Sequence, residues 1–280
     1  MLHQEQKLII SSHIVRLAKK SGSQKRLSNQ AGVSTALISK IANKDFTNIS
    51  DEMFRKLQVT LRIDLDWNTA KTSNYENLIQ LLNTVQSRSL SIAISDHAGM
   101  GKTHVYTHYD QNYSNVIYVE AKNYWTKKSY IKQLCVNSGL SNVGKTEELI
   151  ERFIQHVKGL NKPLIIIDQF DKLKDPQLDL FMDFYNDLSG ACGFVLSGVK
   201  ALEKRILKGV NSDKIGYAEL YSRIGRKFIK LNPISLQDVE LICKANGVTE
   251  QEEINHTYNV CEGDLRRVRR EVERYKILNN

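Results

Sequence analysis

Residues 91–106 read SIAISDHAGMGKTHVY. An apolar run comes first, a loop that contains Gly99 and Gly101 follows it, and the Gly-Lys-Thr triplet then leads into a helical stretch. In a loop of this kind the backbone N–H groups point at phosphate oxygens, and the positive end of the following helix assists them. The order of strand, glycine-bearing loop and helix therefore predicts a phosphate-binding loop of the P-loop type.

The residues of this loop predict ATP and Mg²⁺ as its ligands. Lys102 would reach the β- and γ-phosphates, and Thr103 would place its hydroxyl on Mg²⁺. The other positions expected to contact the nucleotide are Ala98, Gly99, Met100, Gly101 and His104. The usual pattern, GxxxxGKS or GxxxxGKT, has glycine where this chain has Asp96. Because Gly99 and Gly101 remain, the tight cradle next to the phosphates is preserved.

A second motif stands at residues 163–173, which read PLIIIDQFDKL. This is a buried apolar strand that ends in Asp168, as a Walker B motif does, so Asp168 would hold Mg²⁺ through its water shell. The next position normally carries a glutamate that polarises the attacking water, but here it is Gln169. An amide can hydrogen-bond a water molecule but cannot accept its proton, so we expect slow hydrolysis with Gln169 at the catalytic position.

Two explanations of Gln169 compete. The protein is a natural slow ATPase or ATP-binding switch, or the chain carries an engineered Glu→Gln substitution that traps the ATP state. The intact motif around Gln169 favours the second explanation. Asp171 could act as a substitute base, although its place at the strand exit favours a structural role.

Short apolar strands and helical stretches alternate along residues 75–232. The expected strands are 89–95, 115–121, 163–169, 193–198 and 227–231, and the expected helices lie near 103–110, 127–138, 146–159, 175–189 and 199–209. This alternation predicts an α/β fold with a mostly parallel sheet that is covered on both faces. After Pro233 the pattern is helical to the end, which predicts a small lid subdomain at 233–280.

The first 65 residues contain short helices only, and the polar stretch 66–74 is the expected linker to the core. Within residues 24–46, Gly32 marks a turn between two helices and Ser34 is a good N-cap for the second one. The outer face of that helix would offer Ser34, Thr35, Ser39 and Lys40 to the major groove of DNA. The segment resembles the Cro/repressor-like helix-turn-helix family. A helical hairpin used only for packing or protein contact is the alternative.

The two nucleotide motifs resemble those of AAA+ ATPases, and the resemblance implies further site residues. Residues 193–202, GFVLSGVKAL, take the place of the sensor 1 strand, which implies that Ser197 lies near the γ-phosphate. Residues 221–228, YSRIGRKF, offer Arg223 and Arg226 before a strand, as an arginine finger does when it reaches a neighbouring subunit's ATP. The resemblance also favours ATP over GTP.

Residues 261–275, CEGDLRRVRREVERY, have the GxxR spacing of the sensor 2 motif, and the resemblance implies that Arg266 lies at a helix start over the phosphates. Taken singly, each of these arginines fits a surface ion pair equally well. Their order along the chain favours the AAA+ interpretation.

A small helix-turn-helix ahead of a compact AAA+ module resembles the MuB-like family of AAA+ transposition ATPases, to which TnsC, TniB and IstB are related. The resemblance implies an ATP-bound homo-oligomer, a helical filament or a ring, that binds double-stranded DNA and recruits a DDE transposase. Binding would be largely sequence-independent and carried by phosphate contacts. The expected contacts are Lys204, Arg205, Lys208 and Lys214, although a solvated helix face also explains these charges.

Two other functions remain open: a replication loader or initiator resembling DnaC or DnaA, and a transcriptional regulator whose helix-turn-helix is gated by nucleotide. The formal net charge of +9 fits a polyanionic partner in each case. No apolar run approaches the roughly 20 residues that span a bilayer, so no membrane partner is expected. The four scattered cysteines indicate a reducing, cytoplasmic environment.

Overall fold

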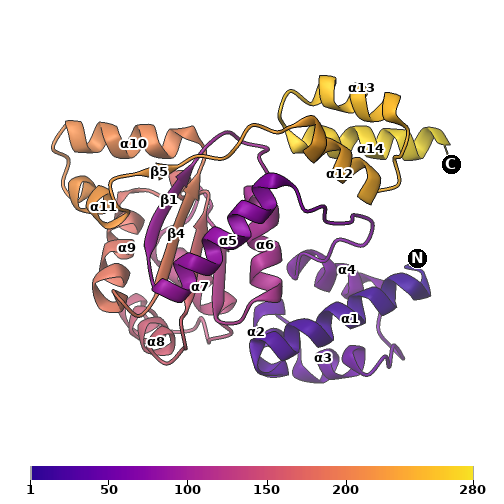
Figure 1. Cartoon of the computed structure of the whole chain (residues 1–280). Coiled ribbons are helices and arrows are strands. Elements are labelled where there is room, and N and C mark those ends of the chain that lie inside the picture. Colours follow the sequence, from indigo (N-terminus) through magenta and orange to yellow (C-terminus); the bar gives the residue numbers. More distant parts are fainter. Residues whose placement is uncertain (1, 280) are drawn as a thin grey trace.

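The computed structural model describes residues 2–279. At its centre lies a parallel sheet of five strands in the order β2-β3-β4-β1-β5 (Figure 1). The strands are β1 (Ser91–Ser95), β2 (Val116–Glu120), β3 (Leu164–Asp168), β4 (Gly193–Gly198) and β5 (Phe228–Ile229). Each lies within a segment where the sequence predicts a strand, and the predicted α/β fold of a P-loop ATPase is confirmed.

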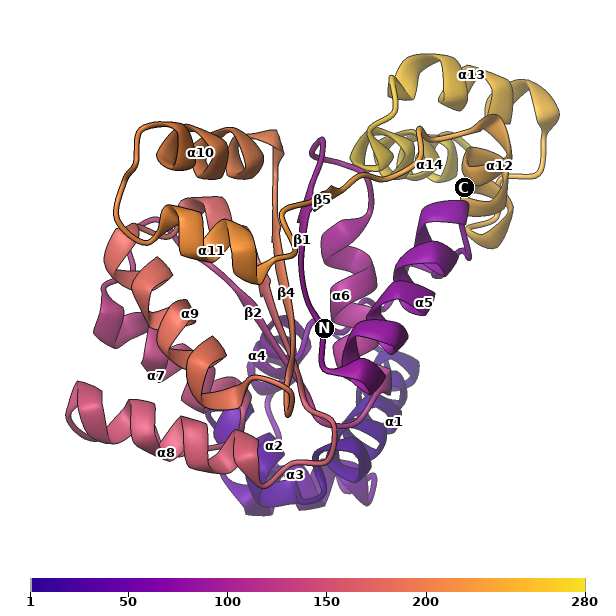
Figure 2. The same cartoon turned by 60° about the vertical axis from the view of Figure 1, so that its left-hand side comes forward.

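Helices cover both faces of the sheet, because successive side chains of each strand point into two different apolar cores. On one face Ile165 and Ile167 pack with helices α7 to α11, and on the other Leu164 and Ile166 pack with α5 and α6 (Figure 2). The covering helices are α5 (Ser73–Arg88), α6 (Lys102–Asn112), α7 (Lys127–Asn137), α8 (Thr146–Lys158), α9 (Asp175–Leu188), α10 (Lys200–Asn211) and α11 (Tyr217–Arg223).

Helix α11 is not predicted by the sequence pattern, and tertiary packing accounts for it. The helix follows Gly216, whose φ of 83° lies in the left-handed region, and it has no side-chain cap. Its Tyr217 and Leu220 are buried in the core that lies under α7 to α10. A Cβ atom at Gly209 of α10 would collide with the Tyr217 ring, so a glycine at this point allows the two helices to pack closely.

The four N-terminal helices enclose a separate apolar core, in which Ile38 is fully buried. They are α1 (Gln4–Ser21), α2 (Gln24–Ala31), α3 (Thr35–Ala42) and α4 (Asp51–Thr60), and residues 2–65 are termed the N-terminal unit below. Three of these helices begin at a serine, Ser23, Ser34 or Ser50, whose hydroxyl accepts a hydrogen bond from the backbone N–H three residues later.

The three C-terminal helices form a lid with its own apolar core around Val268. They are α12 (Leu236–Ala245), α13 (Gln251–Cys261) and α14 (Leu265–Asn279). Met100 of the phosphate loop belongs to the same cluster, and Trp67 packs against it. The guanidinium of Arg269 lies 4.9 Å from the centre of the Trp67 ring. The segment expected as a linker therefore lies against the lid, and helix α5 already begins at Ser73.

The four cysteines are buried as free thiols, as their scattered positions predict. Within residues 2–279, none of the helices combines the length and the apolar character that crossing a membrane requires.

Candidate nucleotide-binding site

The predicted phosphate loop, residues 96–103, connects β1 to α6 at the carboxyl edge of the sheet. Gly99 and Gly101 have φ values of 78° and 87°, a left-handed conformation that glycine adopts without strain. Gly99 is also in close contact with the lid, because a Cβ atom there would collide with the carboxylate of Asp264. The backbone N–H of Leu265 donates to the carbonyl oxygen of Gly99 over 2.9 Å. The start of α14 is thus fixed to the loop.

Lys102 lies inside the phosphate loop and is almost fully buried. Its Nζ donates to the carbonyl oxygens of Asp96 and His97 at 3.1 and 2.7 Å. Burial lowers the pKa of Lys102, although the carboxylates of Asp168 and Asp96 oppose this effect. The ammonium group is therefore held beside the loop backbone, the position from which it can reach bound phosphates.

The two side chains predicted to hold Mg²⁺ are in direct contact. Thr103 Oγ1 donates to Asp168 Oδ2 over 2.6 Å, across the gap between α6 and the end of β3. Asp168 is 2% exposed, and burial raises the pKa of its carboxyl group. Hydroxyl and carboxylate oxygens are the ligands that Mg²⁺ prefers, so this pair fits the ion.

Asp96, the departure from the usual loop pattern, has a structural role of its own. Its Oδ1 accepts from the backbone N–H of His97 and its Oδ2 from that of Leu231, both over 2.7 Å. Asp96 is not among the residues with positive φ, so this position of the loop does not require glycine. The carboxylate ties the phosphate loop to the segment that leads from β5 into the lid.

The side chain of Gln169 faces a carboxylate that no sequence motif indicates. Gln169 Nε2 donates to Glu120 Oε1 over 2.7 Å, and Lys172 Nζ donates to Gln169 Oε1. Glu120 ends β2 and stands opposite Asp168 in the register of the sheet. A glutamate at position 169 would face Glu120 with a second negative charge, so the amide is the matching partner.

Glu120 also binds two cations, one of which comes from the N-terminal unit. Arg62, just after α4, donates to Glu120 Oε2 over 2.9 Å and to the Tyr118 hydroxyl over 3.0 Å. Lys122 donates to Glu120 Oε1 over 3.1 Å. Burial raises the pKa of Glu120, but Lys122 and Arg62 outweigh it, so the pKa lies below its ordinary value. The parallel sheet could have indicated this carboxylate, because β2 and β3 end at the same edge.

Two further polar residues of the sheet edge are held internally. Ser197 is fully buried on β4, and its Oγ accepts from the Tyr106 hydroxyl over 3.0 Å. It lies close enough to Asp168 for a hydrogen bond that lowers the pKa of that carboxyl. Asp171 accepts from the backbone N–H of Val199 over 3.3 Å, which holds the end of β4. Ser197 therefore lies behind the predicted Mg²⁺ ligands. Asp171 makes a structural contact at the end of β4.

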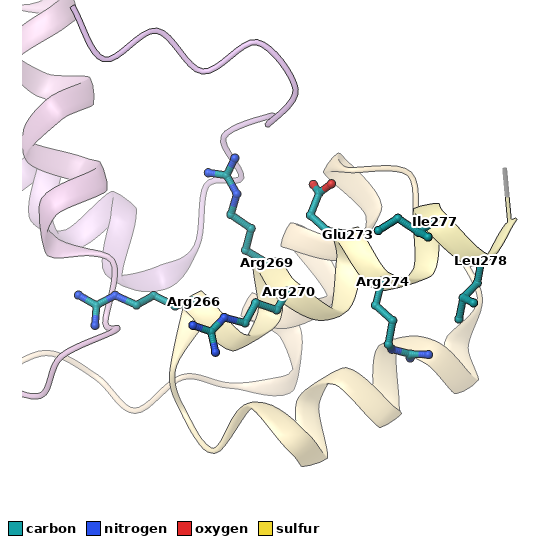
Figure 3. Close-up of a pocket in the computed structure, with 7 residues that line it drawn as sticks. All are labelled: Arg266, Arg269, Arg270, Glu273, Arg274, Ile277 and Leu278. Carbon is teal, nitrogen blue, oxygen red and sulfur yellow. The ribbon is translucent and has the colours of Figure 1, made fainter. Parts of the chain in front are cut away.

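Arg266 lies in the first turn of α14, directly after the residue that bonds to Gly99. Its charge lowers the pKa of Lys102, so the two cations are near each other. Figure 3 shows the Arg266 side chain extending from one end of the helix, far from Ile277 and Leu278 at the other end. The sequence-predicted sensor 2 residue is therefore brought to the phosphate loop.

Arg223 and Arg226 are not brought to the phosphate loop of their own chain by any contact among the described residues. The guanidinium of Arg223 lies over the Tyr185 ring at 5.0 Å and donates to Glu219 over 3.2 Å. Arg226 is exposed, and its carbonyl oxygen accepts from the Tyr221 hydroxyl over 2.7 Å. A role at the nucleotide of a second subunit remains a prediction.

The outer face of α3 is open. Ser34 caps the helix by accepting from the Leu37 N–H over 3.2 Å, and Thr35 and Lys40 are exposed. Ser39 is half-buried. The α/β core contacts the neighbouring helix instead, where Arg26 donates to the carbonyl oxygen of Ser138 over 3.1 Å. The predicted recognition helix is therefore not covered by the rest of the chain.

The predicted DNA contacts on and after α10 divide into two groups. Lys204 and Lys208 are exposed. Arg205 instead donates to Asp175 Oδ1 over 2.7 Å and to the Tyr217 hydroxyl over 2.9 Å. Lys214 binds Asp175 Oδ2 over 2.6 Å. Arg205 and Lys214 thus share one carboxylate, that of Asp175, which balances only one of their two positive charges, and their contact with DNA stays a prediction.

Comparison with known proteins agrees with this geometry. Residues 85–206 match the family model described as an AAA domain, which supports an AAA+ ATPase family and nucleotide-dependent activity. Comparison with curated proteins gave no match. Among solved structures the chain is similar to NtrX from Brucella abortus, with 16% identity and a TM-score of 0.49. The alignment covers 88% of this chain and 58% of that one, so the chain spans less than two thirds of that structure.

Proposed function

We propose that this chain, whose residues 85–206 form an AAA domain, is an ATP-dependent DNA-binding protein. The observation that carries the proposal is the contact between Thr103 and Asp168 beside the buried Lys102. Lys102 would bind the β- and γ-phosphates of ATP, and Thr103 and Asp168 would hold Mg²⁺, which supplies positive charge at the phosphates when bound. Gln169 would orient the attacking water.

The DNA-binding half of the proposal rests on α3. Its open face carries short hydroxyl side chains and Lys40, but no arginine, asparagine or glutamine in its first turn. Such side chains contact phosphates and sugars more readily than they distinguish base edges. Lys204 and Lys208 add exposed positive charge on α10. We therefore propose binding to double-stranded DNA with little sequence preference and a steep dependence on salt.

A more specific role in transposition is also proposed. In this role the ATP-bound chain forms a filament or ring on target DNA and recruits a DDE transposase. The support is the order of the two parts, a helix-turn-helix ahead of the AAA domain, together with Arg223 and Arg226 before β5. Both arginines would reach the nucleotide of a neighbouring subunit, as an arginine finger does.

The test measures binding to random-sequence duplex DNA by fluorescence anisotropy, with and without Mg·ATP, and inspects the same samples by negative-stain microscopy. We expect binding that requires ATP and forms regular oligomers. The variant Lys102→Ala should lose the ATP effect, whereas Lys132→Ala, far from the phosphate loop in sequence, should behave as the parent chain. Lys208→Ala should weaken binding about equally for all sequences and reduce the salt slope by about one unit.

Three outcomes separate the alternatives. Regular ATP-dependent oligomers support the transposition-type proposal, and Arg223→Ala should then abolish them. Discrete particles that bind one palindromic sequence would favour a transcriptional regulator gated by nucleotide. Failure of the parent chain to bind a fluorescent ATP analogue would overturn the nucleotide half of the proposal.

A further inference from the structure

The predicted site lacks a proton acceptor at its usual position, because Gln169 is an amide. Besides Asp96 and Asp168, described above, three carboxylates lie around the loop and the strand ends. Asp171 accepts from the Val199 N–H. Asp264 accepts from the Arg266 N–H over 2.8 Å at the start of α14. Glu120 has no such backbone partner, and its contacts are all with side chains. Of these three carboxylates, Glu120 is the one that can change hydrogen-bond partners without breaking a backbone contact that holds a loop or a helix end.

Glu120 lies directly beside the residue at the water-orienting position. It stands opposite Asp168 across the β2–β3 pair, and its Oε1 accepts from Gln169 Nε2 over 2.7 Å. The side-chain amide at the water-orienting position and the Glu120 carboxylate therefore touch. A water molecule hydrogen-bonded to the Gln169 amide would be within reach of Glu120 as well, since hydrogen-bonded heavy atoms are separated by about 2.6 to 3.2 Å.

We propose that Glu120 is the catalytic base of ATP hydrolysis in this protein, and that Gln169 orients the water for it. This inference rests on the proposed ATPase function. The water oxygen forms a bond to the γ-phosphorus while the bond from that phosphorus to the bridging oxygen of ADP breaks. The bond electrons remain on ADP, the water proton passes to the Glu120 carboxylate, and the products are ADP and inorganic phosphate.

The ion pairs of Glu120 keep its carboxylate charged and reduce its basicity. Arg62 holds Oε2 at 2.9 Å and Lys122 holds Oε1 at 3.1 Å. Because Arg62 belongs to the N-terminal unit, the side of the molecule proposed to meet DNA also touches the proposed base. The attacking water would replace Gln169 Nε2 as the hydrogen-bond donor to Glu120 Oε1. Neither Arg62 nor Lys122 would have to move for this exchange.

The test compares Glu120→Gln, Gln169→Glu and the double variant in the full-length chain. Single-turnover hydrolysis of ATP and the dissociation constant of a fluorescent ATP analogue are measured for each. Glu120→Gln should reduce hydrolysis about 100-fold or more, the usual contribution of a general base. Its affinity for the analogue should change by less than about threefold. Its ATP-bound state on DNA should last correspondingly longer after unbound nucleotide is removed. Glu147→Gln, at an exposed position of α8, is the carboxylate control and should hydrolyse ATP at the parent rate.

The pH profile distinguishes a base from a structural residue. Loss of a base removes the acidic limb of the single-turnover rate in Glu120→Gln, whereas loss of a structural residue lowers the rate but leaves that limb in place. Gln169→Glu together with Glu120→Gln exchanges the acid and the amide, so hydrolysis should recover to within about tenfold of the parent chain. Hydrolysis at the parent rate in Glu120→Gln, or no recovery in a double variant that still binds the analogue, overturns the proposal. A parent chain that binds the analogue but never hydrolyses ATP overturns it while leaving the nucleotide-binding function intact.

Discussion

The lid and the N-terminal unit both touch the AAA core beside the predicted nucleotide site, but they do so through different chemistry. The lid binds the phosphate loop through apolar packing and backbone contacts. Met100 of the loop lies in the lid's core with Val268, and the Leu265 N–H bonds to Gly99. Contacts of this kind depend on burial and change little with salt or pH.

The N-terminal unit reaches the core through charged side chains. Arg62 binds Glu120, and Lys20 binds Asp110 of α6 over 3.0 Å. Arg26 of α2 donates to a carbonyl oxygen at the end of α7. Such contacts are weak singly and can exchange partners. We therefore expect the position of the lid to respond to bound phosphates. The position of the N-terminal unit should respond to changes at the contact between Glu120 and Gln169.

The largest effect should come from a charge in the apolar core of the lid. Val268 is fully buried, so Val268→Asp places an unpaired carboxylate among apolar side chains and should cost about 3 kcal/mol or more of stability. Binding of a fluorescent ATP analogue should fall with it, since α14 carries Arg266. Thermal unfolding and analogue binding are the measurements. Ile277→Asp, at an exposed position of the same helix, should leave both nearly unchanged.

Removal of the Arg62 guanidinium should have a smaller effect that appears in the rate of hydrolysis. Arg62→Ala releases Glu120 Oε2 from a charge-assisted hydrogen bond, so the carboxylate should accept a proton more readily. We expect single-turnover hydrolysis to rise by up to about tenfold, with unchanged affinity for the ATP analogue. Arg55→Ala, an exposed arginine of α4, is the control. A slower reaction in Arg62→Ala would mean that the arginine serves catalysis instead of restraining it.

The pair of Arg62 and Glu120 should also give the docked N-terminal unit a pH dependence. Glu120 has a pKa below its ordinary 4.5 in the folded chain, so the pair stabilises the protein above about pH 4.5. This stability is lost as the pH falls through the lowered value. Partial exposure of both side chains limits it to about 1 kcal/mol or less. The unfolding free energies of the parent chain and Arg62→Ala should therefore differ at pH 7 and converge in acid.

The smallest effect should be a response to salt, which distinguishes the contact of the lid with the core from the contact of the N-terminal unit with the core. Raising the salt from about 0.1 to about 1 M screens partly exposed ion pairs but not apolar packing. Amide hydrogen exchange should increase at the end of α1 and in the segment after α4, where Lys20 and Arg62 form ion pairs with Asp110 and Glu120 of the core. Exchange in α14 should stay constant or decrease. Equal increases in both regions would show that the lid also depends on ion pairs for its position.

The sheet and the phosphate loop could be predicted from the sequence because their signals are local. Each strand is a short apolar run, and the loop residues that bind phosphate are adjacent in the chain. Helix α11 lacks a local signal, since its boundaries follow from Gly216 and from packing of Tyr217 onto Gly209. The strand expected at 227–231 is limited to Phe228–Ile229 because Leu231 already turns its N–H to Asp96.

No local motif indicates the partners of Gln169, because they are distant in sequence. The predicted parallel sheet could have indicated Glu120, since the strands expected at 115–121 and 163–169 end at the same edge, but nothing in the sequence indicates Arg62. Glu120 lies 49 residues before Gln169, and Arg62 lies 58 residues before Glu120. Only the strand register and the docking of the N-terminal unit bring the three together. The same limit applies to Arg205, because no local pattern indicates its ion pair with Asp175 at the start of α9. Composition counts charges, but it does not show which charges are already paired.

Asp96 has a consequence for which substitutions this loop tolerates. Restoring glycine there would recover the usual motif, yet it would free the N–H groups of His97 and Leu231. Leaving a buried donor unpaired costs about 1 to 3 kcal/mol, and the partly buried N–H of Leu231 should cost up to that amount. The joint between core and lid therefore makes the usual motif destabilising in this chain, unless a second change near residue 231 gives that N–H another partner.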